Sequence, residues 1–403
     1  MRVTFVTRRF WPAIGGVERV AMSLGETLSA QGHHVKVVAQ CVDEGRFGRM
    51  THIIRENKPF SPFSHTGVNV VQFRPSRRRR LPLLPFALEL IPLGGRISSG
   101  WLRKHTSGYY AAIVRGVLAP LLVDADVVHV LGGEVMAVAA VETARRLHKP
   151  VAISPFAHPG EWGLDAGSIR AYRAADVVIA TTEADASVYR RVGVEDERLQ
   201  IVSLPVPATS AGDLAAPDKI GETDVERPLV VFLGARRPTK GVDILLEAAP
   251  RVWERHPRAQ FAFLGPGQSL DCKDARLLDV GPVSDADRAM WLSRADLLCL
   301  PSSSESFGLV VPEAWSQSTA VVVSDIPVLR ELVGASGGGI LARRDAAAMA
   351  EAIGSLLDDP ARARALGRAG HDYWHAHLTP EAVADRHLAI YERISLGPGP
   401  PPP

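Results

Sequence analysis

The stretch Pro301-Ser-Ser-Ser-Glu305-Ser-Phe-Gly308-Leu-Val-Val-Pro-Glu313 joins a predicted buried strand to a predicted helix. The strand before it, Leu297–Leu300, is short and fully apolar, and the residues after Gly308 resemble the first turn of a helix. The first amides of a helix have no partner within the helix and lie at the positive end of its dipole. We therefore expect the turn at Gly308 to bind phosphate.

Two carboxylates, Glu305 and Glu313, bracket this turn. Carboxylates repel phosphate, so these side chains are better suited to accept hydrogen bonds from hydroxyl groups. The turn therefore predicts a ligand that carries both phosphates and hydroxyls, as nucleotide-sugars do. The alternative is an ordinary strand-to-helix turn with exposed carboxylates that have no function.

The E-x7-E spacing, with Ser306, Phe307, Gly308 and Leu309 inside it, resembles the donor site of glycosyltransferase family 4, a group of retaining enzymes with the GT-B fold. The similarity covers nearly the whole chain and is weakest between residues 42 and 108. It implies that Glu305 lies beside the donor sugar and diphosphate, that Glu313 holds the ribose hydroxyls, and that the four residues between them contribute to donor binding.

Length and composition indicate an ordinary globular protein with two domains. Its 403 residues exceed the length up to which a single hydrophobic core usually keeps growing. Of these residues, 46% are hydrophobic and 22% are charged. A formal net charge of +2 gives no global signal for nucleic-acid binding. Three isolated cysteines fit a reducing compartment, and the start of the chain resembles no secretory signal, so we expect a cytoplasmic protein.

Apolar strands alternate with amphipathic helices along the chain, which predicts an α/β protein with two doubly wound parallel sheets. We expect a Rossmann-like acceptor-side domain over residues 1–205, a linker over 206–227, where the apolar pattern lapses, and a donor domain over 228–378. The GT-B resemblance implies that the two domains face each other across a cleft and that a helix over 379–395 crosses back to the first. The proline-rich tail, 396–403, is expected to be disordered.

Glycines follow the first strand of the first expected domain at Gly15 and Gly16. Paired glycines let the backbone approach a ligand closely, and the helix that follows offers amides. The pair resembles the family loop that faces the donor diphosphate and the acceptor, and a plain tight turn is the alternative.

The corresponding loop of the second expected domain carries Lys240 and two arginines, which suit a diphosphate leaving group. Lys240 matches the family lysine, but Ala235 occupies the usual arginine position. Either Arg236 or Arg237 then takes its role, and Arg236 is preferred. Gly265 ends the next strand and is expected to border the nucleotide, and a glycine turn needed for steric reasons alone is the alternative. Val283 matches the place where family members contact the base through backbone atoms.

Two histidines lie at strand ends of the first expected domain. His158 matches the place where many family members carry an active-site histidine that faces the donor sugar, and a loop histidine fixed by local turns is the alternative. His129 follows a buried strand, where a histidine that satisfies buried backbone groups is as good an interpretation.

Two Asp-Ala-Asp triplets, Asp124–Asp126 and Asp285–Asp287, look like metal-binding motifs. One precedes a strand and the other opens a helix, where aspartate is a favoured cap, so we expect no metal at either. A basic run, Arg77–Arg80, adjoins leucines and prolines and is a candidate for peripheral contact with an anionic membrane at its inner face. A solvated loop is the alternative.

These motifs predict a metal-independent, retaining glycosyltransferase that moves a sugar from a nucleoside-diphosphate sugar, its donor substrate, to a hydroxyl acceptor of unknown identity. No cofactor and no nucleic-acid partner are expected. Two alternatives remain open: a GT-B nucleotide-sugar epimerase, and a noncatalytic homologue that binds nucleotide or a partner.

After Glu313 the family continues with small residues and then Gly-Pro, whereas this chain has Trp315 and then Ser318-Thr-Ala. This departure leaves the end of the helix open.

Overall fold

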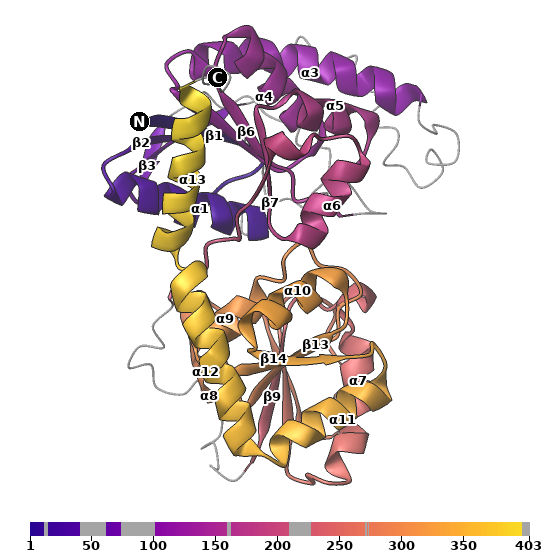
Figure 1. Ribbon diagram of the computed structural model, residues 1–403. Helices are drawn as coiled ribbons and strands as arrows, with labels where there is room; N and C mark the ends of the chain where they lie inside the picture. The colour runs from indigo at the N-terminus through magenta and orange to yellow at the C-terminus, as the bar shows by residue number, and fades with distance from the viewer. Residues whose placement is uncertain are drawn as a thin grey trace. The chain divides into compact units, whose positions relative to one another are not determined.

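Two sheets whose strands are almost all parallel form the framework of the chain in a computed structural model (Figure 1). The structure describes residues 1–11, 15–40, 62–73, 101–158, 163–208, 227–270, 272 and 274–396, and of residues 101–110, 113, 134 and 135 the backbone only. The contacts divide the chain into two units. Unit 1 consists of Met1–Thr181, Asp185–Val202 and Val383–Pro403, and unit 2 of Thr182–Ala184 and Ser203–Ala382.

The sheet of unit 1 has the strand order β3-β4-β2-β1-β5-β6-β7-β8. Every pairing in it is parallel except that of β3 with β4. The strands are β1 (Arg2–Thr7), β2 (His34–Gln40), β3 (Phe63–His65), β4 (Val68–Phe73), β5 (Val127–Leu131), β6 (Val151–Ser154), β7 (Val177–Ala180) and β8 (Leu199–Ile201).

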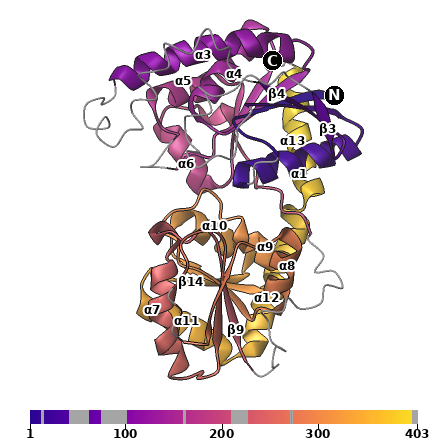
Figure 2. The ribbon, with the colours of Figure 1, turned by 180° about the vertical axis from the view of Figure 1, so that it is seen from behind.

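Helices cover both faces of this sheet, as Figures 1 and 2 show. They are α1 (Gly16–Ala30), α3 (Trp101–Leu122), α4 (Glu134–Arg146), α5 (Ala166–Ala174), α6 (Glu183–Arg191) and α13 (Pro380–Ser395). Strands such as β5, β6 and β7 are buried at every residue, as continuous apolar runs in a parallel sheet should be. The main core of unit 1 fills the space between these strands and helices α3, α4 and α5.

The sheet of unit 2 is parallel throughout, with the order β11-β10-β9-β12-β13-β14. Its strands are β9 (Leu229–Leu233), β10 (Gln260–Leu264), β11 (Leu277–Gly281), β12 (Leu297–Leu300), β13 (Ala320–Ser324) and β14 (Gly339–Ala342). Helices α7 (Val242–Trp253) and α11 (Ala346–Leu357) lie on one side (Figures 1 and 2). The remaining helices are α8 (Asp285–Arg294), α9 (Val310–Ser316), α10 (Pro327–Ser336) and α12 (Pro360–His377).

The expected doubly wound architecture is confirmed, with two local differences. The mostly apolar run Ile201–Leu204 predicts a strand over those residues, whereas β8 spans Leu199–Ile201, because its pairing with β7 stops at Ile201. The antiparallel edge strand β3 was not expected. It has only three residues, too few for an alternating pattern to stand out.

The last helix, α13, begins in unit 2 and continues in unit 1 from Val383 onward. Its buried residues, Val383, Ala384, His387, Ile390 and Tyr391, recur at helical spacing and form one face. This is the crossing that the GT-B resemblance implied. The expected linker falls mostly in residues 209–226 and the tail in 397–403, both outside the described residues.

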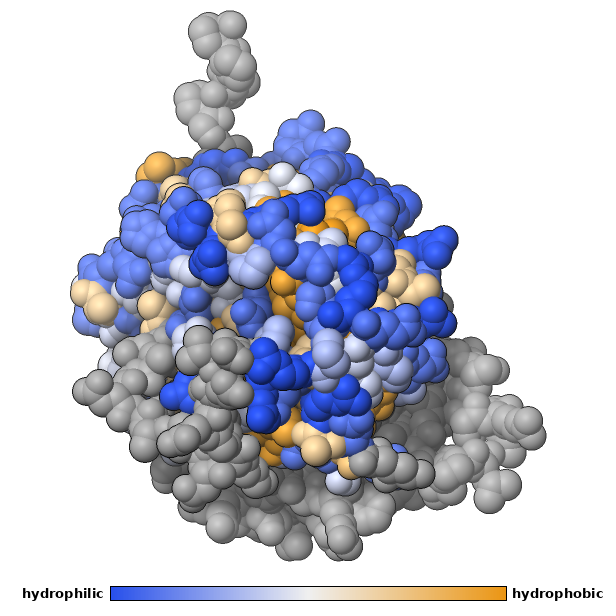
Figure 3. All heavy atoms as spheres, turned by 90° about the horizontal axis from the view of Figure 1, so that it is seen from below, coloured by the Kyte–Doolittle hydropathy of each residue, from blue (hydrophilic) through white to orange (hydrophobic). Residues whose placement is uncertain are grey.

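The face of the molecule seen in Figure 3 is mostly hydrophilic, with hydrophobic residues in small scattered groups. Within the described residues, no helix has both the length and the apolar character needed to cross a bilayer.

Candidate functional site

Two loops that leave neighbouring strands bring Lys240 to Glu305. Strands β9 and β12 are paired in parallel, so the loops after them start at the same edge of the sheet. Lys240 Nζ donates to Glu305 Oε1 at 2.6 Å, and the Ser302 hydroxyl donates to the same oxygen at 2.7 Å. The side chain of Glu305 is only 8% exposed. The two loops therefore hold a nearly buried carboxylate against a cation from 65 residues earlier in the chain.

Backbone contacts lock these two loops together. Gly241 has φ +72°, and a Cβ at this position would lie 2.1 Å from the carbonyl oxygen of Pro301, so only glycine allows the approach. Arg344, which follows β14, donates from Nε to Pro301 O at 3.0 Å and from Nη2 to Pro238 O at 2.7 Å. The amide of Ser303 donates to Thr239 O at 2.8 Å. These hydrogen bonds fix the turn that carries Lys240 against the loop that carries Glu305.

Glu313 lies in the first turn of α9, where it contacts an arginine from α8. Arg288 Nη1 lies 3.1 Å from Glu313 Oε1, and Arg288 Nη2 lies 3.2 Å from Asp285 Oδ1. Sequence reasoning missed Arg288 because nothing in the pattern of α8 says which residue of another helix its side chain meets. Val283 lies directly before Ser284, the N-cap of α8, so the predicted base-contacting turn adjoins Arg288.

The turn between Glu305 and Glu313 combines a buried anchor with a glycine. The side chain of Phe307 is fully buried and anchors the turn to the interior of unit 2. Gly308 has φ +83°, and a Cβ there would lie 2.9 Å from Leu329 Cδ2. Ser306 and Leu309 flank these residues, and Leu309 is the N-cap of α9. The predicted donor-binding residues of this stretch therefore form one continuous turn.

The two arginines of the Lys240 loop point to different surroundings. Arg236 is 4% exposed, forms an ion pair with Asp279, and donates to Phe263 O at 3.0 Å and to Gln268 O at 3.2 Å. Arg237 is exposed, and no ion pair or side-chain hydrogen bond of it is found among the described residues. Gly265 has φ +129° and allows the backbone to approach Gly234 O. The structure thus brings Lys240 to Glu305 but directs Arg236 toward Asp279.

The predicted site residues of unit 1 are Gly15, Gly16 and His158. Gly15 is the N-cap of α1, and its extended φ is one that any residue adopts. Glycine is favoured there because a Cβ would lie 2.3 Å from Glu18 Oε2. Glu18 Oε1 in turn accepts from Arg9 Nε at 2.7 Å. His158 is partly buried and lies beyond the carboxyl end of β6. These residues belong to unit 1, whereas the lysine and the two glutamates belong to unit 2.

His129 belongs to the core of unit 1. Its Nδ1 lies 2.6 Å from the Tyr391 hydroxyl of α13 and its Nε2 lies 2.9 Å from Ser154 Oγ. Burial, and secondarily the charge of neighbouring His387, lowers the pKa of His129 well below its usual value. This contact supports a structural role for His129, the alternative that the sequence left open.

Both Asp-Ala-Asp triplets have protein partners. Asp124 pairs with Lys36 at 2.6 Å and Asp126 with Arg2 at 2.8 Å. In the second triplet, the Asp287 side chain completes a capping box with Ser284. Within the described part of the chain, no cluster of three or more potential metal ligands is found. The basic run Arg77–Arg80 lies outside the described residues.

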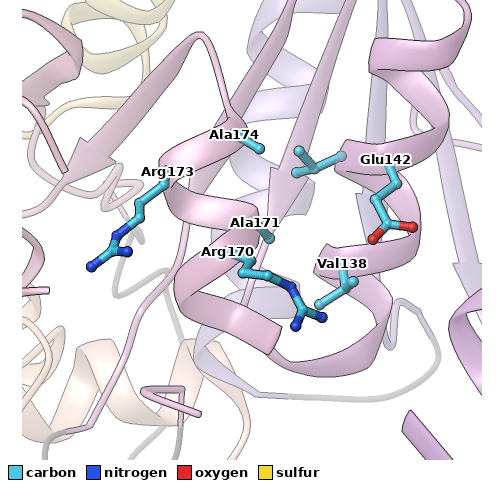
Figure 4. Close-up of a pocket in the computed structure, with 7 residues that line it drawn as sticks. Val138, Glu142, Arg170, Ala171, Arg173 and Ala174 are labelled. Carbon is cyan, nitrogen blue, oxygen red and sulfur yellow. The ribbon is translucent and has the colours of Figure 1, made fainter. Parts of the chain in front are cut away.

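A pocket between α4 and α5 lies apart from these motifs (Figure 4). Its lining combines four apolar residues with three charged ones: Val138, Val141, Glu142, Arg170, Ala171, Arg173 and Ala174. In Figure 4, Arg173 points away from the other labelled side chains. Arg173 donates to Val192 O at 2.7 Å. The pocket contains none of the predicted site residues.

Comparison with protein families identifies the chain. Residues 15–205 match the model of the glycosyl transferase 4-like domain, and residues 227–359 match that of the glycosyl transferases group 1. The chain is 31% identical to a D-inositol 3-phosphate glycosyltransferase 1 of Catenulispora acidiphila over 386 residues, 83% of this chain and 88% of that protein. The chain belongs to glycosyltransferase family 4. It is a glycosyltransferase.

Other relatives give the same result. A D-inositol 3-phosphate glycosyltransferase of Xylanimonas cellulosilytica is 26% identical over 87% of this chain and 85% of that protein. Among solved structures, the sucrose-phosphate synthase of Thermosynechococcus elongatus has a TM-score of 0.68 and 20% identity, over 98% of this chain and 100% of that one. The E. coli trehalose-6-phosphate structure bound with UDP-2-fluoro glucose has a TM-score of 0.74 and 11% identity, over 98% and 99%. These structures share the GT-B fold of this glycosyltransferase.

Proposed function

We propose that this family 4 glycosyltransferase is a retaining, metal-independent enzyme that transfers a sugar from a nucleoside-diphosphate sugar to a hydroxyl acceptor. The observation that carries the proposal is the contact of Lys240 with Glu305, held by Gly241 and Arg344 at one edge of the sheet. A carboxylate and a cation at this edge suit a ligand with hydroxyls beside phosphates. The name of a similar solved structure includes a UDP-sugar, which supports the same donor class.

Each end of the donor has its own group of residues. Glu313 accepts hydrogen bonds from the ribose, and Val283 lies beside the base. Lys240 and the Ser306–Leu309 turn surround the diphosphate, with Gly265 at the nucleotide border. Arg237 is the better arginine for the diphosphate, because the Arg236 guanidinium already contacts Asp279 and two backbone carbonyls. Gly15, Gly16 and His158 contribute from unit 1, where His158 positions the acceptor or the sugar hydroxyls.

Cations stabilise the charge that develops on the leaving diphosphate, which is the main chemical demand of this reaction. No carboxylate of unit 1 stands out in the sequence as a nucleophile for the opposite face of the sugar. We therefore favour front-face displacement. The bond from C1 to the diphosphate oxygen breaks, the acceptor oxygen bonds to C1 on the same face, and the hydroxyl proton passes to the leaving phosphate.

A donor panel tests the proposal. Purified enzyme is first screened for binding of UDP-, GDP- and ADP-sugars, and each bound donor is then incubated with a panel of acceptors. Mass analysis of the product identifies transfer, and NMR of the new linkage shows whether the anomeric configuration is retained. The panel includes myo-inositol phosphates and phosphatidylinositol, since the names of the relatives contain inositol 3-phosphate and phosphatidyl-myo-inositol.

The same experiment separates the alternatives. A nucleotide-sugar epimerase changes the donor sugar without any acceptor, and a noncatalytic homologue binds nucleotide without turnover. Transfer that occurs only with acceptor supports a transferase. An inverted linkage would contradict the retaining assignment while leaving the transferase assignment intact.

We expect transfer to need no divalent metal, because the carboxylates of both Asp-Ala-Asp triplets already serve ion pairs or a helix cap. Activity should be unchanged within about twofold after treatment with EDTA. Loss of activity with EDTA and recovery with Mg²⁺ or Mn²⁺ would contradict this expectation.

Peripheral contact of the basic run with an anionic membrane, at the cytoplasmic face, stays a proposal that rests on the sequence alone. Each arginine near an anionic surface contributes about 1 kcal/mol, and salt weakens the attraction. Cosedimentation with acidic vesicles at low and high salt tests it, with the Arg77–Arg80 to serine variant as control. Absence of wild-type cosedimentation at low salt would identify the run as a solvated loop.

A further inference from the structure

Arg288 connects the predicted ribose carboxylate to the start of α8. Its Nη1 contacts Glu313 Oε1 at 3.1 Å and its Nη2 contacts Asp285 Oδ1 at 3.2 Å. The side chains of Arg288 and Glu313 are 17% and 18% exposed, whereas that of Asp285 is 63% exposed. The pair between Arg288 and Glu313 is therefore shielded from solvent, and the contact with Asp285 is not.

The backbone that carries Arg288 is firmly held. The Arg288 amide donates to Ser284 O at 2.9 Å, and Ser284 with Asp287 forms the capping box that starts α8. The residues after Arg288, Ala289 to Leu292, are buried in unit 2. Arg288 thus lies one turn after Val283, in a helix whose start and buried face are both fixed.

A carboxylate that recognises ribose must present an oxygen in one direction. A free glutamate samples several rotamers, and ordering it on binding weakens affinity. Arg288 donates a charge-assisted hydrogen bond to Oε1 of Glu313, which limits the rotation of the carboxylate. The carboxylate is then pre-oriented before the nucleotide arrives.

We propose that Arg288 is a positioning residue for ribose recognition: it orients the Glu313 carboxylate and ties it to the helix that begins at the base-contacting turn. This inference rests on the proposed assignment of Glu313 to the ribose hydroxyls. Arg288 acts through Glu313 and determines how strongly the site prefers ribose over sugars that lack its hydroxyls.

The test compares nucleotides with and without ribose hydroxyls. Dissociation constants of UDP and GDP and of their 2′,3′-dideoxy forms are measured by calorimetry for each variant. A hydrogen bond to a charged group contributes enough binding free energy that the wild type should bind the ribonucleotide at least about tenfold more tightly than its dideoxy form. Glu313→Gln should reduce this preference to about twofold or less, and Arg288→Met should reduce it at least about threefold.

Three further variants sharpen the result. Arg288→Lys, which keeps the charge but not the paired guanidinium nitrogens, should give an intermediate preference, and it replaces Arg288→Met if that variant does not fold. The Arg288→Met/Glu313→Gln double variant should match Glu313→Gln alone, because both changes remove one interaction. Arg294→Met, an exposed arginine on the same helix, should keep the wild-type preference.

Two results overturn the inference, and they differ. If Glu313→Gln loses the preference while folded Arg288→Met or Arg288→Lys keeps it at the wild-type value, Glu313 binds ribose without help from Arg288. If Glu313→Gln itself keeps the wild-type preference, the ribose assignment fails and the role of Arg288 fails with it.

Discussion

The contact between Lys240 and Glu305 shows how single residues set the character of this site. Glu305 is nearly buried, and its Oε1 accepts from both Lys240 and Ser302. A shielded carboxylate is costly unless such donors accompany it. Gly241 makes the contact available, because any Cβ there would collide with Pro301. One glycine, one lysine and one glutamate from two separate loops therefore act as a unit.

Replacing Lys240 by alanine should lower kcat/KM for sugar transfer by about 10²-fold or more, the scale of removing one preorganised charge donor. Steady-state kinetics with the donor found in the panel measures the effect.

Loss of Lys240 also leaves Glu305 without its cation, so the melting temperature of each variant must be measured as well. The double variant Lys240→Ala/Glu305→Gln removes the unpaired charge and restores stability if that is the only defect. Arg251→Ala, an exposed cation at the end of α7, serves as the matched control. Transfer at the wild-type rate by a folded Lys240→Ala protein would refute the assignment.

Among the elements, α9 ends in a way that the sequence left open. The Thr319 amide donates to Ala314 O at 3.0 Å and the Ser318 amide to Trp315 O at 2.8 Å, which is a Schellman motif. Ser318 takes the left-handed position with φ +60°, where glycine is usual. Trp315 is fully buried, and a Cβ on Gly370 would lie 2.2 Å from its ring. The absence of a side chain at Gly370 of α12 thus leaves room for the ring of Trp315.

Ser318→Gly should raise the free energy of unfolding by about 0.5–1 kcal/mol, because glycine adopts the left-handed conformation without the steric cost of a Cβ. Ser318 is exposed, so the change removes no buried contact. Urea unfolding measures the difference.

Ser355→Gly, inside α11, is the matched control and should lower the free energy of unfolding by about the same amount. Equal signs for the two substitutions would contradict the role of the left-handed conformation at Ser318.

Helix α13 is fixed to unit 1 through buried histidines. His129 contacts Tyr391, and the rings of His129 and His387 lie 5.5 Å apart. Burial lowers the pKa of His387 to about 4, although its contact with Val383 O opposes the shift, and the pKa of His129 is also lowered. Both imidazoles are therefore neutral in the folded protein near pH 7.

Stability should fall as the pH drops from 6.5 toward 4. The unfolded chain protonates these histidines near pH 6.5, whereas the folded chain resists protonation until about pH 4 for His387. Between these values each histidine lowers the free energy of unfolding by up to about 1.4 kcal/mol per pH unit. Above pH 6.5 neither contributes.

Urea unfolding at pH 5 and pH 7.5 measures this dependence. His387→Leu should reduce it, and His375→Gln, which alters an exposed histidine of α12, should leave it unchanged. A His387→Leu variant with the full wild-type dependence would show that other groups cause it.

At the scale of the whole molecule, unit 1 is completed by the end of the chain. Most of its strands and helices lie before residue 202, but α13 supplies five buried side chains from Val383 onward. Unit 2 is built almost entirely from the segment between them. The first unit therefore cannot complete its native packing until the last helix has been made.

A chain that stops after Thr379 should lose stability in unit 1 far more than in unit 2. Removal of α13 uncovers His129 and the apolar side chains it packs against, while the strands of unit 2 keep their partners. Limited proteolysis followed by mass analysis should therefore degrade residues 1–202 first and leave a fragment that starts near Ser203. Equal protection of both segments would contradict this assignment of α13.

The sequence by itself determined the succession of strands and helices and the E-x7-E turn. Apolar runs such as Leu229–Leu233 and Leu297–Leu300 match observed strands, because a strand buried on both faces must be apolar throughout. The turn at Gly308 is local as well. Such features depend on neighbours in the chain, so a pattern can reveal them. The short strand β3 escaped for the opposite reason, since three residues show no pattern.

Only the tertiary structure decided which side chains meet. Lys240 and Glu305 lie 65 residues apart, and Arg288 and Glu313 lie 25 apart. Arg236 and Arg237 are adjacent and chemically identical, yet one turns to Asp279 and the other to solvent. His129 reads from sequence as a site residue or a core residue, and contact with Tyr391 makes it part of the core. Packing of separate elements fixes such partners, and no periodicity within one element encodes them.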